Sequence, residues 1–345
     1  MEGHLFFLKS LCEACYYTIE FFRRIEQAEY VSAWRSILNK LIELDAYPVR
    51  TTLKILLQDK TTKQSIIWAT DAYKDNIGVK DTDQIEMSHL VGMDPILLQP
   101  RISKAAEEQQ ERTRKKAEVF TPVWICNQMN NYLDEEWFGR KDVFNIEGEQ
   151  TWTTIEEQVS FPPKKTWKHY IDSRRLEITC GEAPYLVSRY DAATGELIEP
   201  PKHRIGLLDR KLRIINENAT DYEEWMKWAL RAFQSCYGYE YQGDSLLIAR
   251  INLIMTFNDY YVERWEKDPD TKILRLFANI IAWNLWQMDG FTDAVPLGKP
   301  QETEHQINMF EFLGEETPEE KKEAPLCKIW DWRRDNAIIY KMLKG

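Results

Sequence analysis

The chain has 345 residues, of which 43% are hydrophobic and 12% aromatic, and this is typical of a globular protein and excludes wholesale disorder. The length leaves room for two domains and a sizeable core. The formal net charge of −11 is the opposite of the basic surplus of most free-standing nucleic-acid-binding proteins, so any DNA contact must come from a local patch or a partner.

Residues 4–45 carry apolar side chains at helical spacing, and Pro48 ends this pattern. Within the pattern, Cys12 and Cys15 have the spacing of a zinc-ligand pair. A structural zinc site needs four ligands and no second pair follows, so we interpret both as core residues. No apolar run here or later reaches the roughly 18 residues that a membrane span requires.

Two short β-like runs at residues 53–57 and 66–70 flank a polar segment and predict a small hairpin. The charge-dense stretch 102–118 predicts a solvated helix or linker. We place a domain boundary there. This gives a mostly helical N-terminal region at residues 1–105 and a second domain at residues 106–345.

Strand and helix patterns alternate in the second domain. Residues 175–179 predict a strand, and Asp221 with the acidic residues after it predicts the start of a helix. Residues 238–241 predict the next strand, and Asp244 or Ser245 caps the helix that follows. This alternation predicts an α/β fold with a parallel sheet of the doubly wound type.

The end of the chain is acidic at residues 297–326, which predicts a surface loop, and a last apolar piece follows at residues 327–332. The six cysteines of the whole chain are few and scattered, which favours a reducing cytoplasm over a disulfide scaffold. Five histidines are too few to suggest a His-built metal centre. We therefore expect a cytoplasmic protein without a metal.

The first predicted strand ends in a sharp turn at Gly181, where the lack of a side chain lets a ligand approach the backbone. Pro184 suits the first turn of a helix that would follow. Glu240 ends the next strand, and a carboxylate in that place accepts hydrogen bonds from ribose hydroxyls. These residues predict a site for a nucleoside-bearing cofactor at the carboxyl ends of parallel strands. A plain structural turn is the alternative interpretation.

Four motifs of the second domain occur in a telling order: Phe120-Thr121-Pro122; Leu176-Glu177 with Cys180-Gly181 and Leu186; Glu240 with Ala249-Arg250-Ile251-Asn252-Leu253; and the segment from Asn279 to Leu285 with Asn284 at its polar position. The ordered set resembles the DNA methyltransferases that act on the amino group of adenine. Those enzymes belong to restriction–modification systems and use S-adenosylmethionine. The resemblance covers roughly residues 110–345 and implies a Rossmann-like methyltransferase fold there.

The resemblance also implies which residues bind S-adenosylmethionine. They are Phe120, Thr121, Pro122, Glu177, Cys180, Gly181, Glu240 and Asn284. Two departures from the family pattern make the cofactor loop bulkier, because Ile178 replaces a proline and Ala183 replaces a second glycine.

A third departure concerns catalysis. The family's catalytic tetrapeptide, N-P-P followed by an aromatic residue, is expected after the piece that Asp331-Trp332 resembles, and it does not occur in this sequence. In the family, this tetrapeptide holds the target amine and stacks on the flipped base. The resemblance therefore implies no catalytic residue in this chain and no activity of the chain alone. It also implies an open sheet edge, since the strand with the tetrapeptide lies beside the first strand.

These observations lead to two rival expectations. The first is the S-adenosylmethionine-binding part, or modification (M) subunit, of an adenine-specific (N6) DNA methyltransferase, which obtains the missing motif from another chain. Its partners would be DNA, reached through a partner subunit, and a second methyltransferase or restriction subunit. The second is a catalytically inactive binding or scaffold subunit that keeps the methyltransferase fold, and a remnant of a broken gene is a third possibility.

Overall fold

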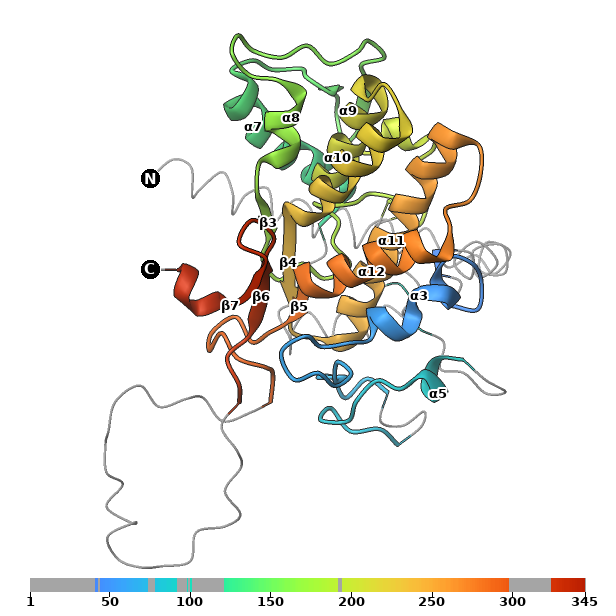
Figure 1. Cartoon of the computed structure of the whole chain (residues 1–345), viewed down its shortest axis with the longest axis vertical. Helices are drawn as coiled ribbons and strands as arrows, with labels where there is room; N and C mark the ends of the chain where they lie inside the picture. Colours follow the sequence, from blue (N-terminus) through green and yellow to red (C-terminus); the bar gives the residue numbers. More distant parts are fainter. Residues whose placement is uncertain are drawn as a thin grey trace, which may run out of the picture.

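The structure is a computed structural model that describes residues 41–42, 44–73, 78–91, 98, 100, 121–191, 194–297 and 324–344 (Figure 1). The helices expected at residues 4–45 lie almost wholly outside these ranges, and so do the charged stretch 102–118 and most of the acidic loop 297–326. Within the described ranges, no helix is both long enough and apolar enough to cross a membrane.

The N-terminal part corrects one expectation. Residues 53–57 are not a strand, because α3 (Val49–Leu56) is a helix that includes most of them. Val49, Thr52, Leu53 and Leu56 are its buried residues, and their spacing puts them on one helical face. The second half of the expected hairpin survives only as isolated antiparallel bridges, one of which joins Ile67 to Gln84. The short helix α5 (Met87–Leu90) follows.

A parallel sheet forms the centre of the molecule, as the alternating pattern predicted. Its strands are β3 (Arg175–Glu177), β4 (Cys236–Glu240) and β5 (Leu285–Gln287), in the order β3-β4-β5. The chain between β3 and β4 contains α9 (Leu207–Asn218) and α10 (Tyr222–Gln234), and the chain between β4 and β5 contains α11 (Gly243–Trp265) and α12 (Thr271–Asn284). Asp221 caps α10 as expected, since its carboxylate accepts the Glu224 N–H at 2.8 Å. The α/β class is therefore confirmed.

Several elements around the sheet had no counterpart in the sequence-based prediction. They are α7 (Val123–Phe138), β1 (Asn145–Glu147), β2 (Trp152–Thr154), α8 (Trp167–Asp172), the 3₁₀ helix η2 (Pro201–His203), β7 (Asn336–Ile339) and the 3₁₀ helix η4 (Tyr340–Leu343). Strand β1 pairs with β2, and β7 pairs with β6 (Lys328–Asp331), both in antiparallel hairpins. The terminal apolar piece forms β6.

The two faces of the sheet are covered differently. Leu285 of β5 belongs to the large core that also contains residues of α11 and α12. Its neighbour Trp286 points to the other face, because side chains alternate along a strand. There it joins a smaller cluster with Tyr239 of β4, Ile329 of β6 and Tyr340. The terminal hairpin therefore covers the face of the sheet opposite to the helices. The doubly wound arrangement that the alternation predicted, with helices on both faces, is not formed by the described residues.

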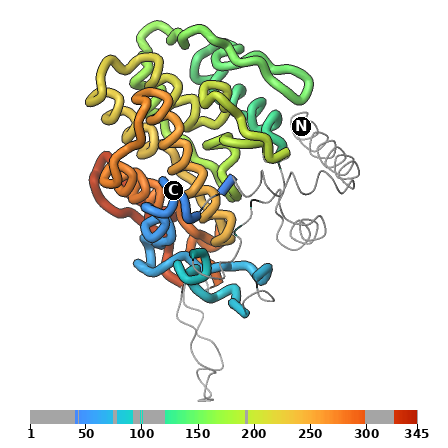
Figure 2. The backbone as a smooth tube through the Cα atoms, turned by 90° about the vertical axis from the view of Figure 1, so that its right-hand side faces the viewer, coloured from blue at the N-terminus to red at the C-terminus, as the bar shows by residue number. Residues whose placement is uncertain are grey.

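The N-terminal part shares the core of the second domain. Helix α3 lies against α12 and α11 (Figures 1 and 2). The fully buried Arg250 of α11 reinforces this contact, because its guanidinium donates to the carbonyl groups of Leu56 and Gln58 on one side and of Leu285 on the other. Described residues on both sides of the expected boundary near residue 105 thus form one hydrophobic core.

Candidate functional site

Most of the predicted cofactor-binding residues gather at the carboxyl edge of the sheet. Because β3, β4 and β5 are parallel, their last residues, Glu177, Glu240 and Gln287, all lie at this edge. The pairing register places Glu177 beside Gly238 and Glu240 beside Gln287. This edge is where ligands of open α/β sheets bind.

Glu240 is connected to the glycine turn that follows β3. Its Oε2 accepts the N–H of Gly181 at 2.8 Å, and its Oε1 accepts the N–H of Tyr241 at 2.9 Å and of Gln242 at 3.1 Å. Gly181 has φ +53°, and a Cβ placed on it would meet no atom within 4 Å. The turn is thus open where a ligand would approach, with an acidic acceptor beside it.

Glu177, the last residue of β3, binds the backbone of the turn that follows the strand. Its carboxylate is buried and accepts the N–H groups of Tyr185 at 3.3 Å and Leu186 at 3.1 Å. Burial raises the pKa of Glu177 to about 8, and the charge of Glu240 adds to the rise, while the two N–H donors oppose it. Glu177 therefore acts on the conformation of residues 181–186.

The helix expected after the glycine turn is absent from the structure. Residues 181–187 form irregular turns, with Ala183 at φ +64°. The N–H groups that a helix beginning at Pro184 would direct at a ligand point to Glu177 instead. The expectation failed because the carbonyl groups of Tyr185 and Leu186, which a helix would pair with N–H groups four residues later, accept the N–H groups of Leu207 and Leu208 instead, and sequence spacing alone does not reveal such contacts.

Cys180 lies inside the turn as a packed side chain. It is 2% exposed, and its N–H donates to the Tyr239 carbonyl at 2.8 Å. Burial raises the pKa of its thiol well above the usual value. Cys180 therefore ties the turn to β4. The other described cysteines, Cys126, Cys236 and Cys327, are also free and buried.

The first predicted motif lies only partly in the described residues, because Phe120 falls outside them. Pro122 is the N-cap of α7, and its carbonyl accepts the N–H of Ile125 at 3.0 Å. Burial raises the pKa of Tyr185, and the side chain hydrogen-bonds with Thr121 and Cys126. The structure thus brings Thr121 and Pro122 next to the residues that follow the glycine turn.

Asn284 does not lie with the other candidates. It precedes β5, so it is at the amino end of the strands, opposite to Glu240. Its Nδ2 donates to the Phe233 carbonyl at 2.8 Å and the Cys236 carbonyl at 3.0 Å, and its Oδ1 accepts the Trp332 indole N–H at 2.8 Å. This side chain fastens α10, β4 and the terminal hairpin together, and we remove it from the candidate site.

Three residues that follow β4 and β5 were not among the candidates from the sequence. Asp289 follows β5 closely, and its Oδ1 accepts the N–H of Phe291 at 2.8 Å. The side chain of Phe291 is 101% exposed. Tyr241 lies near Asp289 and Asp81, whose charges add to the effect of burial and raise its pKa. The sequence does contain a signal for Asp289, because an acidic residue lies at or just after the end of both strands: Glu240 ends β4, and Asp289 lies two residues after β5.

Within the described part of the chain, no group of three or more His, Cys, Asp or Glu side chains could hold a metal ion. Comparison with known proteins finds no matching family model, no similar curated protein and no similar solved structure. The site must therefore be interpreted from its own residues.

Proposed function

We propose that this chain is the S-adenosylmethionine-binding part of an adenine-specific DNA methyltransferase of a restriction–modification system. One observation carries the proposal, namely the 2.8 Å contact between the Gly181 N–H and the Glu240 carboxylate across two adjacent parallel strands. A glycine turn after one strand and an acid at the end of the next is the arrangement of a Rossmann-like nucleotide-binding half. The ordered motifs of the sequence add the resemblance to methyltransferases.

Different residues of the carboxyl edge would bind different parts of S-adenosylmethionine. The Glu240 carboxylate would accept the ribose hydroxyls, and the open backbone at Gly181 would face the methionine part. The exposed ring of Phe291 and the ring of Tyr241 offer aromatic surfaces for the adenine base. The bound cofactor would supply a methyl group on a good leaving group. The protein's task is then positioning and electrostatic stabilisation.

The base-holding tetrapeptide would come from a partner chain. Among the described residues β3 pairs with β4 alone, and the terminal hairpin pairs within itself. Leu176 is 48% exposed and Ile178 is 61% exposed along this part of the chain. An open strand edge with exposed apolar side chains favours the addition of another strand. We infer that the chain alone does not methylate DNA and that it reaches DNA through this partner.

A second candidate is a scaffold subunit that keeps the fold but binds no cofactor. It is favoured by the extent to which the turn is satisfied internally, because Glu177 and Glu240 already accept backbone N–H groups. The two candidates differ in a measurable way, since only the first requires the carboxyl edge to bind S-adenosylmethionine.

Isothermal titration calorimetry with S-adenosylmethionine and its demethylated product separates the two candidates. We expect the full chain to bind both ligands, and Glu240→Gln to weaken binding about tenfold to a hundredfold, because hydrogen bonds to a charged group are lost. Glu149→Gln is the matched control, since Glu149 is exposed in the β1–β2 turn. No heat at millimolar ligand, or equal binding by the Glu240→Gln variant, would leave the scaffold as the better interpretation.

A further inference from the structure

Helix α7 buries an unusual set of side chains. A surface helix normally turns its apolar stripe to the core. The buried residues of α7 include Asn127, Asn130 and Asp134, whereas Met129 and Tyr132 are exposed at 43% and 60%. Buried polar groups are retained in proteins when they form hydrogen bonds. The partners of these side chains therefore indicate what the helix does.

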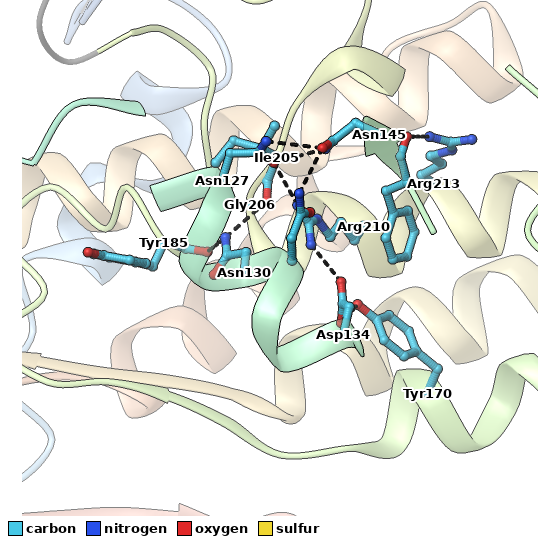
Figure 3. A network of polar contacts seen from close by, with 12 residues as sticks. Asn127, Asn130, Asp134, Asn145, Tyr170, Tyr185, Ile205, Gly206, Arg210 and Arg213 are labelled. Atoms are coloured by element: carbon cyan, nitrogen blue, oxygen red, sulfur yellow. Dashed lines mark hydrogen bonds and ion pairs between the residues drawn. The ribbon is translucent and has the colours of Figure 1, made fainter. Parts of the chain in front are cut away.

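One set of partners holds α7 to α9 (Figure 3). Arg210 of α9 is 1% exposed, and its Nη1 lies 2.6 Å from the Asp134 carboxylate. Its Nη2 donates to Asn127 Oδ1 at 2.9 Å and to Asn131 Oδ1 at 2.7 Å. A planar guanidinium bound on several sides fixes both position and orientation. Helix α7 is therefore a fixed platform.

The side chain of Asn130 does not bind Arg210 but points toward the chain that follows the glycine turn (Figure 3). Its side chain is fully buried, and Nδ2 donates to the Tyr185 carbonyl and to the Ile205 carbonyl, each at 3.0 Å. Both protons of the amide are thus used, one on each of two segments that are 20 residues apart. Asn130 joins these two segments to α7.

The two segments also contact each other directly. Leu207 N–H donates to the Tyr185 carbonyl at 2.8 Å, and Leu208 N–H donates to the Leu186 carbonyl at 2.8 Å. A Cβ on Gly206 would lie only 2.4 Å from the Leu186 carbonyl oxygen, so this approach requires glycine. Asn130 therefore bridges two segments whose backbones are already packed too closely to shift relative to each other.

Residues 181–188 depend on such side chains because they form neither helix nor strand. Glu177 binds two of their N–H groups, Asp209 accepts the Ser188 N–H at 2.8 Å, and Asn252 donates to the Glu182 carbonyl at 3.1 Å. Each of these side chains comes from a different element. Polar side chains from outside thus add to the backbone hydrogen bonds within the turn, such as that from the Val187 N–H to the Ala183 carbonyl at 2.9 Å, and Asn130 is the one on α7.

We propose that Asn130 is a positioning residue that sets the conformation of residues 181–188 and couples it to the start of α7. Thr121 and Pro122 precede α7, so the Asn130 amide helps to hold the first motif and the glycine turn in register, together with the Tyr185 side chain that hydrogen-bonds with Thr121. Asn130 touches no ligand in this scheme. Its effect on cofactor affinity rests on the proposed function, whereas its effect on the turn does not.

Amide hydrogen–deuterium exchange of the full chain tests the proposal without a ligand. Asn130→Asp keeps the shape but loses both donors and places a carboxylate against two carbonyl oxygens, and Asn130→Ala serves if that variant does not fold. We expect exchange within residues 185–188 and 205–208 to accelerate roughly tenfold or more, because local opening becomes easier. Gln128→Ala is the control, since Gln128 is an exposed residue of the same helix.

Titration of the same proteins with S-adenosylmethionine completes the test. We expect about tenfold weaker binding by the Asn130 variants and unchanged binding by Gln128→Ala. Unchanged exchange in residues 185–188 would overturn the proposal, and so would faster exchange with wild-type affinity. If the wild-type chain binds no cofactor at all, the proposed function fails, and the exchange measurement still decides the role of Asn130.

Discussion

The two ends of the parallel sheet use polar residues in different ways. At the amino end, the side chain of Asn284 hydrogen-bonds with three internal groups, and one of them, the indole N–H of Trp332, attaches the terminal hairpin there. At the carboxyl end, the backbone is open at Gly181 and the ring of Phe291 is fully exposed. One end is therefore built for fastening, while the other has surfaces that a ligand could reach.

The difference teaches how to separate stability from binding in this chain. Polar side chains at the amino end bridge helices and strands, so their loss should unfold the protein without a specific effect on the site. Side chains at the carboxyl end act on turns, so their loss should alter the site, and the buried Glu177 makes the free energy of unfolding depend on pH. Each of the following predictions tests one half of this contrast.

The largest expected effect belongs to the amino end. Asn284→Ala leaves the carbonyl groups of Phe233 and Cys236 and the indole N–H of Trp332 without their partner. Each buried polar group left unsatisfied costs about 1–3 kcal/mol, so we expect the free energy of unfolding to fall by about 4 kcal/mol. Urea denaturation followed by tryptophan fluorescence measures it. A variant as stable as the wild type, or one that stays folded but loses cofactor affinity, would contradict the contrast.

The second prediction concerns pH at the carboxyl end. The folded-state pKa of Glu177 is raised to about 8 from an ordinary value of 4.5. A carboxyl with a raised folded-state pKa contributes stability that is present below pH 4.5 and is lost as the pH rises toward 8. We expect this group to remove about 3 kcal/mol of stability between pH 5 and pH 8, since one pKa unit corresponds to about 1.4 kcal/mol.

Glu177→Gln isolates this contribution, because the amide is neutral at every pH in the range. The difference in unfolding free energy between the variant and the wild type should move in favour of the variant as the pH rises. Denaturation series at pH 5, 6, 7 and 8 give this difference directly. Other buried acids such as Asp209, whose pKa burial raises to about 7, titrate in both proteins and cancel. Parallel stability curves for the two proteins would show that Glu177 is charged in the native state near its ordinary pKa.

The sequence predicted those features that depend on local pattern. The alternation of strand and helix identified β3, β4, α10 and α11 because each has its own apolar periodicity and, for α10, a capping residue in Asp221. The pattern at residues 53–57 was ambiguous, because a short apolar run fits a strand or a helix and burial against α12 decides. Helix α7 was not predicted because its buried face includes polar residues while apolar residues such as Met129 are exposed, so the spacing of its apolar residues does not mark the buried face.

Single residues at strand ends carry the sequence signal for the candidate site, and the structure brings two of them, Gly181 and Glu240, into contact. Long-range contacts leave no such signal in the sequence. The carbonyl groups of Tyr185 and Leu186 accept the N–H groups of Leu207 and Leu208, 22 residues later, and this contact replaces the expected helix with a turn. Asn284 was misplaced because its position relative to β5 determines which edge it faces, and a motif match does not specify the strand boundary. The link from Asn130 to Ile205 spans 75 residues and leaves no local trace.

The smallest expected effect sharpens the contrast at the carboxyl end. Phe291 is fully exposed, so Phe291→Ala should change the free energy of unfolding by no more than about 0.5 kcal/mol. If its ring stacks on the adenine of a bound cofactor, the same variant should bind S-adenosylmethionine about three- to tenfold more weakly, since an aromatic contact is worth about 0.5–1.5 kcal/mol. Met342→Ala is the matched control, because Met342 is another large apolar side chain that is 76% exposed. Thermal melts and calorimetry of both variants decide the matter. Equal affinities for the two variants would remove Phe291 from the site and restrict the binding surface to the Gly181 turn, Glu240 and Tyr241.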